Sequence, residues 1–174
     1  MALAATIDST GECVWRAITD PAQRLLWDDR ILGAIGSTPG GSPRRRSIRT
    51  PSRPPTAAAI HEARWRFLWA GIPLVLVDEI HRTEGHERSF GRFSIGSMRF
   101  DQTLAISEER DDGGPRSRLA MKLVANNTIA VFGELIPRLE VQRLAIEYVD
   151  TTLRLVRKHC EAQTPAPIDV QLAH

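Results

Sequence analysis

The sequence lacks the features that mark membrane and secreted proteins. No run of eighteen apolar residues could span a bilayer, and the N-terminus has no basic region followed by an apolar stretch and a cleavage site. We therefore expect a cytoplasmic protein without a transmembrane segment. Cysteine is also scarce: Cys13 and Cys160 lie far apart in the chain, which favours free thiols over a disulfide framework, and neither looks like a nucleophile.

Motifs that identify a catalytic or cofactor site are missing as well. There is no Gly-x-Ser-x-Gly nucleophile elbow and no Gly-x-Gly-x-x-Gly dinucleotide fingerprint. The five histidines do not form an i, i+4 pair with a third ligand nearby, so no metal site is predicted. A net charge of +2 is too small to indicate nucleic acid. We predict neither a cofactor nor a nucleic-acid partner, and the oligomeric state stays open.

The composition that is present indicates one globular domain. The chain has 174 residues, of which 42% are hydrophobic and 25% charged, enough to bury a core without metal or disulfide support. We place this domain at residues 1–162. Residues 163–174, which contain two prolines and no hydrophobic periodicity, are expected to form a disordered tail.

Residues 37–59 are predicted to form a flexible insertion. They are mainly Pro, Gly, Ser, Thr, Ala and Arg, with almost nothing apolar to offset the entropy of ordering, so folding should not need them. Arginine recurs at Arg44, Arg45, Arg46, Arg49 and Arg53. A solvated loop, an anionic partner and phosphorylation of Ser47 are all compatible with this cluster, but no aromatic residue is interleaved for base stacking.

The most prominent periodic segment is residues 127–161, which we interpret as a long C-terminal helix. One apolar stripe recurs every three or four residues and consists of Phe132, Leu135, Ile136, Leu139, Ile146, Val149, Leu153 and Val156. A neighbouring stripe consists of Val141, Leu144, Tyr148 and Leu155. The combined apolar arc is wide enough to predict a helix held by a concave sheet. Pro137 should kink this helix.

The N-terminal part predicts a strand followed by two short helices. Residues 1–7 alternate in the two-residue period of a strand. Ser9 and Glu12 have capping-box spacing for a first helix, and Asp20-Pro21 begins a second that ends near Trp27. Another short strand is expected at residues 30–35.

Residues 62–125 predict an antiparallel meander. Alternating segments at 62–69, 74–82, 88–95, 98–107 and 117–125 are separated by short turn sequences. Gly91 interrupts one strand and should permit a bulge or bend. The predicted fold class is therefore α+β, with a curved antiparallel sheet around the C-terminal helix.

The sequence resembles the START-like, or SRPBCC (Bet v 1-like), superfamily, especially its bacterial polyketide cyclase/dehydrase-like branch. The likeness is carried by the opening strand and helix with Val14-Trp15-Arg16-Ala17-Ile18-Thr19-Asp20-Pro21, by the long hairpins, and by the terminal helix. It covers residues 2–160 apart from the insertion. The resemblance implies a helix-grip fold with a cavity that binds a lipid, an isoprenoid or a polyketide-like molecule. It leaves open an aromatase/cyclase-like enzyme and a co-chaperone or regulatory module, and it supplies no catalytic residue.

Inward-facing positions of the predicted strands and helix give the candidate pocket residues. They are Trp65, Phe67, Leu76, Asp78, Phe93, Phe100, Gln102, Met121, Phe132 and Ile136. Asp78 and Gln102 share the two-residue register of apolar neighbours, so both should point inward, where a buried polar group needs a partner. They are candidate ligand anchors, with a structural hydrogen bond as the alternative.

Overall fold

The computed structural model describes residues 1–35, 61–111, 114–126, 130–131, 134–135 and 138–164. Its elements, in chain order, are β1 (Ala2–Ile7), α1 (Gly11–Thr19), α2 (Pro21–Trp27), β2 (Ile31–Ala34), β3 (His61–Trp69), β4 (Ile72–Glu84), β5 (Arg88–Ile95), β6 (Met98–Asp111), β7 (Gly114–Ala125), β8 (Ala130–Val131), β9 (Glu134–Leu135) and α3 (Arg138–Gln163). The predicted insertion at 37–59 and residues 165–174 of the predicted tail at 163–174 lie outside the described residues, whereas Gln163 is the last residue of α3.

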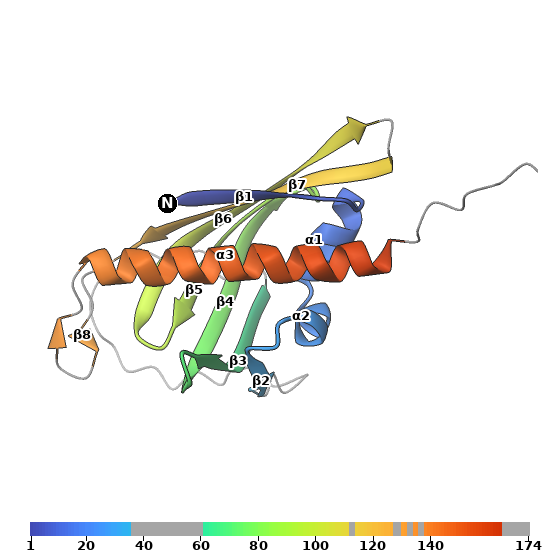
Figure 1. Ribbon diagram of the computed structural model, residues 1–174. Helices are drawn as coiled ribbons and strands as arrows, with labels where there is room; N and C mark the ends of the chain where they lie inside the picture. The colour runs from blue at the N-terminus through green and yellow to red at the C-terminus, as the bar shows by residue number, and fades with distance from the viewer. Residues whose placement is uncertain (36–60, 112–113, 127–129, 132–133, 136–137, 165–174) are drawn as a thin grey trace, which may run out of the picture.

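The main sheet has seven strands in the order β1-β7-β6-β5-β4-β3-β2, and every pairing in it is antiparallel. Strands β3 to β7 form the predicted meander. The N-terminal strand β1 pairs with β7, which follows much later in the sequence. The curved sheet carries α3 across one face, while α1 and α2 lie beside the C-terminal half of that helix (Figure 1). The α+β helix-grip prediction is confirmed.

Gly91 lies opposite an irregularity in the pairing of β4 with β5. The register between β4 and β5 shifts between Ile80 and Arg82, so the extra residue, His81, lies on β4 rather than on the strand that contains the glycine. A Cβ atom at Gly91 would lie 2.0 Å from the carbonyl oxygen of Glu79. Only glycine permits this close approach of two backbones, which confirms the predicted irregularity and moves the bulge to the neighbouring strand.

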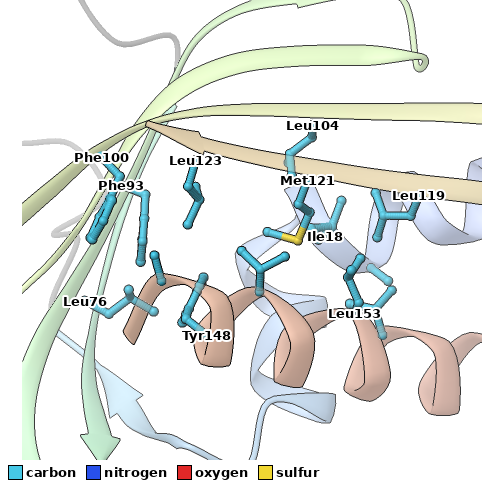
Figure 2. Packing of buried hydrophobic residues seen from close by; sticks show 14 of the residues in the cluster. Ile18, Leu76, Phe93, Phe100, Leu104, Leu119, Met121, Leu123, Tyr148 and Leu153 are labelled. Carbon is cyan, nitrogen blue, oxygen red and sulfur yellow. The ribbon is translucent and has the colours of Figure 1, made fainter. Parts of the chain in front are cut away.

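The hydrophobic core fills the space between the sheet and α3. Alternate residues of each central strand point toward the helix because side chains of a strand alternate between its two faces. Tyr148, Val149, Leu153 and Val156 of α3 are buried against them, as Figure 2 shows for Tyr148 and Leu153. Ile146, which we expected on the buried stripe, is instead 47% exposed.

The two short helices begin at residues with polar caps. Thr10, rather than the predicted Ser9, caps α1, and its hydroxyl accepts the Cys13 N–H at 3.3 Å. Ser9 is itself buried. The adjacent threonine therefore accepts the hydrogen bond from the first turn of the helix. The predicted start of α2 is confirmed, because Asp20 accepts the Ala22 N–H at 2.8 Å and Pro21 is the first helical residue.

The start of the C-terminal helix differs from the prediction. The helix begins at Arg138, and residues 130–131 and 134–135 pair as the two short strands β8 and β9. Extending the helix back to Asn127 was therefore wrong. A proline has no backbone N–H and is tolerated only in the first turn of a helix, which explains why a helix begins directly after Pro137. The predicted kink lies outside the described residues.

Among the residues that the structure describes, no helix is long and apolar enough to cross a membrane.

Candidate interior binding site

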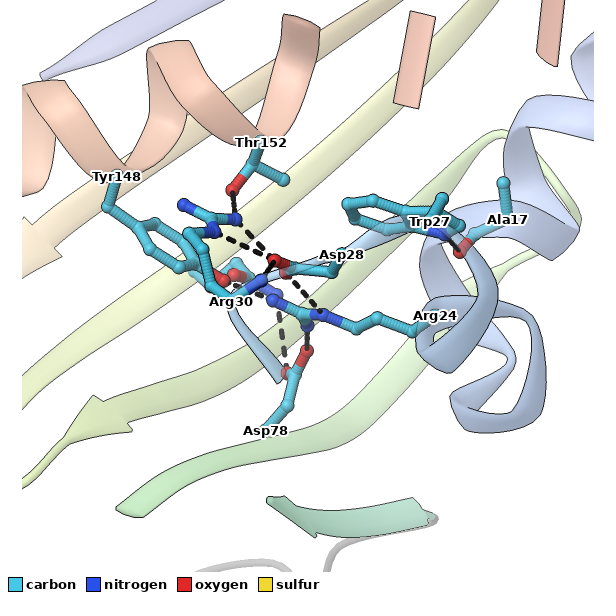
Figure 3. Close-up of polar contacts among 9 residues, drawn as sticks. Ala17, Arg24, Trp27, Asp28, Arg30, Asp78, Tyr148 and Thr152 are labelled. Atoms are coloured by element: carbon cyan, nitrogen blue, oxygen red, sulfur yellow. Dashed lines mark hydrogen bonds and ion pairs between the residues drawn. The ribbon is translucent and has the colours of Figure 1, made fainter. Parts of the chain in front are cut away.

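A group of polar side chains lies inside the domain, between the sheet and α3. We call it the buried polar cluster (Figure 3), and its members are Arg24, Asp28, Arg30, Asp78, Gln102, Tyr148 and Thr152. These residues come from α2 and the segment after it, from β4 and β6, and from α3. The cluster thus joins the short helices, the sheet and the long helix at one place.

Arg24 is the centre of the cluster. Its Nη1 donates to Asp78 Oδ2 at 3.0 Å, its Nη2 donates to the Tyr148 hydroxyl, and its Nε lies 3.5 Å from Asp28 Oδ2. Gln102 Nε2 donates to the second Asp78 oxygen at 3.4 Å. Asp78 is therefore held from both sides, as a buried carboxylate requires.

The second arginine links the cluster to α3. Arg30 makes a two-pronged contact with Asp28, with Nε to Oδ1 at 2.7 Å and Nη2 to Oδ2 at 3.0 Å. The same Nη2 donates to Thr152 Oγ1 at 2.9 Å. Planar guanidinium groups favour such paired hydrogen bonds to carboxylates.

Aromatic rings form the walls around these charges. The Arg24 guanidinium lies 5.0 Å from the ring centroid of Trp65, and that of Arg30 lies 5.1 Å from Phe67 and 5.0 Å from Tyr148. Contacts of this kind are attractive and grow stronger when water is excluded. The cations are thus stabilised by rings as well as by carboxylates.

Burial governs the protonation of the cluster. It raises the pKa of the Asp78 carboxyl, and the positive charge of Arg24 opposes this rise without cancelling it. Burial also raises the pKa of the Tyr148 hydroxyl, so tyrosine stays neutral and accepts from Arg24. Burial lowers the pKa of the Arg24 guanidinium, but Tyr148, Asp78 and Asp28 together raise it by more, so the guanidinium remains charged.

A histidine that the sequence did not single out lies near this site. The charge of His61, the first residue of β3, is one of the influences that lower the pKa of Asp78. Its Nε2 atom is buried and makes no hydrogen bond within the described part of the chain. An imidazole nitrogen without a partner near a buried carboxyl is a group that a ligand or water could satisfy.

A pocket of about 180 Å³ lies at the beginning of α3. It is lined by Met1, Phe100, Leu123, Val124, Ala125, Val141, Gln142 and Ala145. The Phe100 ring stacks on Phe93 at 5.3 Å, and Phe93 stacks on Tyr148 at 4.4 Å between centroids. This stack of three rings therefore connects the pocket, which Phe100 lines, with the buried polar cluster, to which Tyr148 belongs.

The described residues among the predicted pocket candidates all point into the interior. Trp65, Phe67, Leu76, Asp78, Phe93, Phe100, Gln102 and Met121 are buried between the sheet and the helix. Phe100 borders the pocket, Asp78 and Gln102 belong to the cluster, and the others pack in the core around them. Phe132 and Ile136 lie outside the described residues.

Sequence reasoning missed Arg24, Asp28 and Arg30, which supply most of the charge of the cluster. A weak signal existed, because Arg24 precedes the buried Trp27 by three residues and thus shares its helical face. Periodicity does not indicate what a charged residue on such a face contacts. The partners of Arg24 lie 54 and 124 residues away in the sequence.

No family model matches the sequence, and no curated protein matches it significantly. Several solved structures share its fold. A START superfamily protein from Mycobacterium smegmatis aligns with a TM-score of 0.62 at 12% identity, covering 94% of this chain and 98% of the other. A protein from Thermus thermophilus aligns with a TM-score of 0.60 at 18% identity over 95% and 99% of the two chains. The Zhui aromatase/cyclase from Streptomyces sp. R1128 aligns with a TM-score of 0.60 at 12% identity over 95% of each.

Proposed function

The chain has the START-like, or SRPBCC, polyketide cyclase-like fold, and on this premise we propose that it binds a hydrophobic small molecule between the sheet and α3. A lipid, an isoprenoid or a polyketide-like compound has the required chemistry. The observation that carries the proposal is an apolar pocket that a stack of three aromatic rings links to a buried set of hydrogen-bonding groups. Apolar walls with a few polar anchors are typical of small-molecule sites.

The pocket is too small for a drug-sized ligand unless the aromatic rings beside it move. Pockets for drug-sized ligands have volumes of roughly 300–1,000 Å³, whereas this one measures about 180 Å³. A larger ligand must therefore displace the Phe100 and Phe93 rings from their stack. Removing Phe93 from Tyr148 opens the way to the Tyr148 hydroxyl and to Asp78.

The charges of the cluster restrict the buried end of the ligand. Arg24 and Arg30 are balanced by Asp28 and Asp78 through the ion pairs described above. A ligand with a net charge would upset this balance at a site where an uncompensated charge is costly. A neutral hydroxyl or carbonyl group can instead exchange hydrogen bonds with Tyr148, Asp78 or Gln102.

A second candidate function is an aromatase/cyclase-like reaction at the same place. The observation in its favour is Asp78, a buried carboxyl whose pKa is raised and which lies near His61. A raised carboxyl pKa suits proton transfer near neutral pH. In this case Asp78 would move a proton to or from the bound molecule, and Arg24 and Gln102 would position its two oxygens.

The binding proposal is tested by native mass spectrometry of the protein purified from its own host, followed by identification of any retained compound. We expect a bound hydrophobic molecule in the wild type and in Arg154→Trp, which adds the same bulk at an exposed position further along α3. Gln142→Trp should lose it, because Gln142 is exposed and lines the pocket, so the indole can cover it without entering the core.

Retention of the same compound by Gln142→Trp would contradict the location of the site. The absence of any retained compound, together with no binding of a hydrophobic fluorescent probe by the wild type, would contradict the function itself. Asp78→Asn separates the two candidates: retained affinity with lost turnover of the identified compound favours the enzyme, whereas a compound that is never turned over favours binding alone.

A further inference from the structure

The hairpin of β3 and β4 is more apolar at its end than packing on the core requires. The eleven residues 67–77 include no charged side chain. Earlier in β3 the residues on the outer face of the sheet, away from α3, are charged, as at Arg66. Toward the turn this face carries Leu68, Pro73 and Val75, and all three are exposed. Strands with one face in water normally keep polar residues on that face, so packing does not explain this end of the hairpin.

The end of the hairpin projects from the sheet on a fixed base. In the described sheet the pairing of β3 with β2 reaches only to Phe67, and the pairing of β4 with β5 begins only at Leu76. Residues 69–74 therefore have no third strand beside them, and Ile72 is 57% exposed. The ring of Trp69 stacks on that of Tyr148 in α3, with 5.8 Å between centroids, and so holds the turn against the domain.

Arginines follow directly behind this apolar end. Arg66 faces Val75 across the ladder, and Arg99 lies on the same outer face one row further from the turn. Both are exposed, and neither has a carboxylate within ion-pair distance in the part of the chain that the structure describes. The first acidic residues of this face in β4 and β6, Glu79 and Asp101, lie one row beyond Arg99. From the turn backward the surface is thus apolar, then basic, then mixed.

We propose that the end of the β3–β4 hairpin docks onto an anionic lipid bilayer, with the turn inserted among the head groups. Arg66 lies three residues before Trp69, or about 10 Å along a strand. Interfacial segments bury their apolar side by roughly 5–10 Å, so an inserted turn brings the arginines to the lipid phosphates. Tryptophan is typical of this depth. The proposal does not rest on the interior ligand.

A second copy of the chain fits this surface less well than a bilayer does. Stable protein interfaces bring together roughly 20–30 residues on each side. The exposed apolar side chains of the hairpin are few, and they lie on a projection: Leu68, Ile72, Pro73 and Val75. A projection enters a fluid lipid surface without needing a matching cavity, and the unpaired arginines behind it are complementary to anionic head groups.

The full chain is mixed with vesicles made of equal parts of phosphatidylglycerol and phosphatidylcholine, and the bound fraction is measured by flotation. We expect binding that weakens with salt and is much weaker on vesicles of phosphatidylcholine alone. Ile72→Glu should weaken binding at least about tenfold, because it replaces an inserted apolar side chain with a charge. Ile146→Glu, the same change at an exposed position of α3, is the matched control and should bind like the wild type.

Arg66→Gln tests the electrostatic part separately and should weaken binding to the anionic vesicles about fivefold. Vesicles with brominated acyl chains test insertion, because bromine quenches a nearby indole. Trp15, Trp27 and Trp65 are buried, so quenching should come from Trp69 and be lost in Trp69→Phe, although that variant still floats with the vesicles.

Three results would overturn the proposal. The first is a wild type that does not bind the anionic vesicles. The second is equal binding by Ile72→Glu and Ile146→Glu. The third is a wild-type dimer in light scattering that Ile72→Glu converts to a monomer, which would assign the hairpin to a second copy of the chain.

Discussion

At the scale of single residues, Arg24 is the group on which the interior depends most. It contacts Asp78, Asp28 and Tyr148 and lies over the ring of Trp65, and its side chain is only 3% exposed. Its charge compensates two carboxylates that are removed from water. The consequences of losing it should therefore exceed those of losing any single hydrogen bond.

We expect Arg24→Met to lower the free energy of unfolding by about 3–5 kcal/mol, because it leaves buried acidic groups without their partner. Urea unfolding at pH 7 measures this change. Arg16→Met on the exposed face of α1 is the control and should shift the free energy by less than about 0.5 kcal/mol. Equal stability of the two variants would show that the cluster is not compensated through Arg24.

Asp78 should give the protein a distinctive pH dependence. Its folded-state pKa is raised above the ordinary value of 3.8, so the folded protein holds the proton more tightly than the unfolded chain. The stability contributed by this proton is complete below the unfolded pKa and is lost as the pH rises through the folded one. The free energy of unfolding of the wild type, measured relative to Asp78→Asn, should thus fall as the pH increases from about 4.

Urea titrations of both proteins at several pH values between 4 and 8 measure this difference. A difference that grows with pH instead would mean that the attraction of Arg24 outweighs burial and lowers the pKa of Asp78. Protein with Gln102→Ala can serve as a further comparison, since it removes one neutral donor to Asp78 while keeping the carboxyl and its cation.

The residue scale also shows what could be predicted from the sequence and what could not. The two-residue register placed Asp78 and Gln102 inside, and both are buried there. A register indicates the face on which a residue lies but not the partner that meets it from another element. Arg24 reaches Asp78 from α2 because of how that helix crosses the sheet, and no local pattern encodes this crossing.

At the scale of elements, Gly91 controls how closely β4 and β5 approach. A side chain at this position would collide with the backbone oxygen of Glu79, which cannot rotate away as a flexible side chain could. The close approach of the two strands therefore depends on the absence of one methyl group. Bulges of this kind bend the strand that contains them and so add to the curvature of a sheet.

We expect Gly91→Ala to lower the free energy of unfolding by about 3 kcal/mol, at the upper end of typical overpacking costs. Gly85→Ala is the control: its φ is +57°, and no heavy atom lies within 4 Å of the added Cβ, so only backbone strain of about 1–2 kcal/mol applies. Thermal unfolding of both variants measures the difference. A smaller loss of stability at Gly91 than at Gly85 would show that β4 and β5 can move apart at little cost in free energy.

Helix and strand prediction failed at one identifiable place. The apolar spacing of Phe132, Leu135, Ile136 and Leu139 suits a helix, yet β8 and β9 occupy part of this region. Strands of two residues are too short to show a two-residue period, so pairing between chain segments decides their conformation. Pro137 was the better signal, since it marked a boundary that we interpreted as a kink.

At the scale of the whole molecule, the order of elements was predictable and the state of the interior was not. Alternating strands, short turns and a terminal apolar helix led to an α+β layout with a curved sheet around that helix, and the family resemblance implied the helix-grip fold, which the structure has. Whether the interior is hollow depends on side-chain volumes meeting across the domain. Tyr148 fills much of the space that the expected cavity would occupy, stacking on Phe93 and on Trp69.

The pairing of β1 with β7 also sets the time at which the protein can fold during synthesis. Ala2 lies opposite Lys122 and Ile7 opposite Ser117, so β1 cannot pair until β7 has been made. The helix that covers the sheet leaves the ribosome later still. Until then the apolar face of the meander has no cover, and contacts so distant in sequence form slowly. The apolar face of the sheet is therefore open to aggregation during synthesis until α3 has been made.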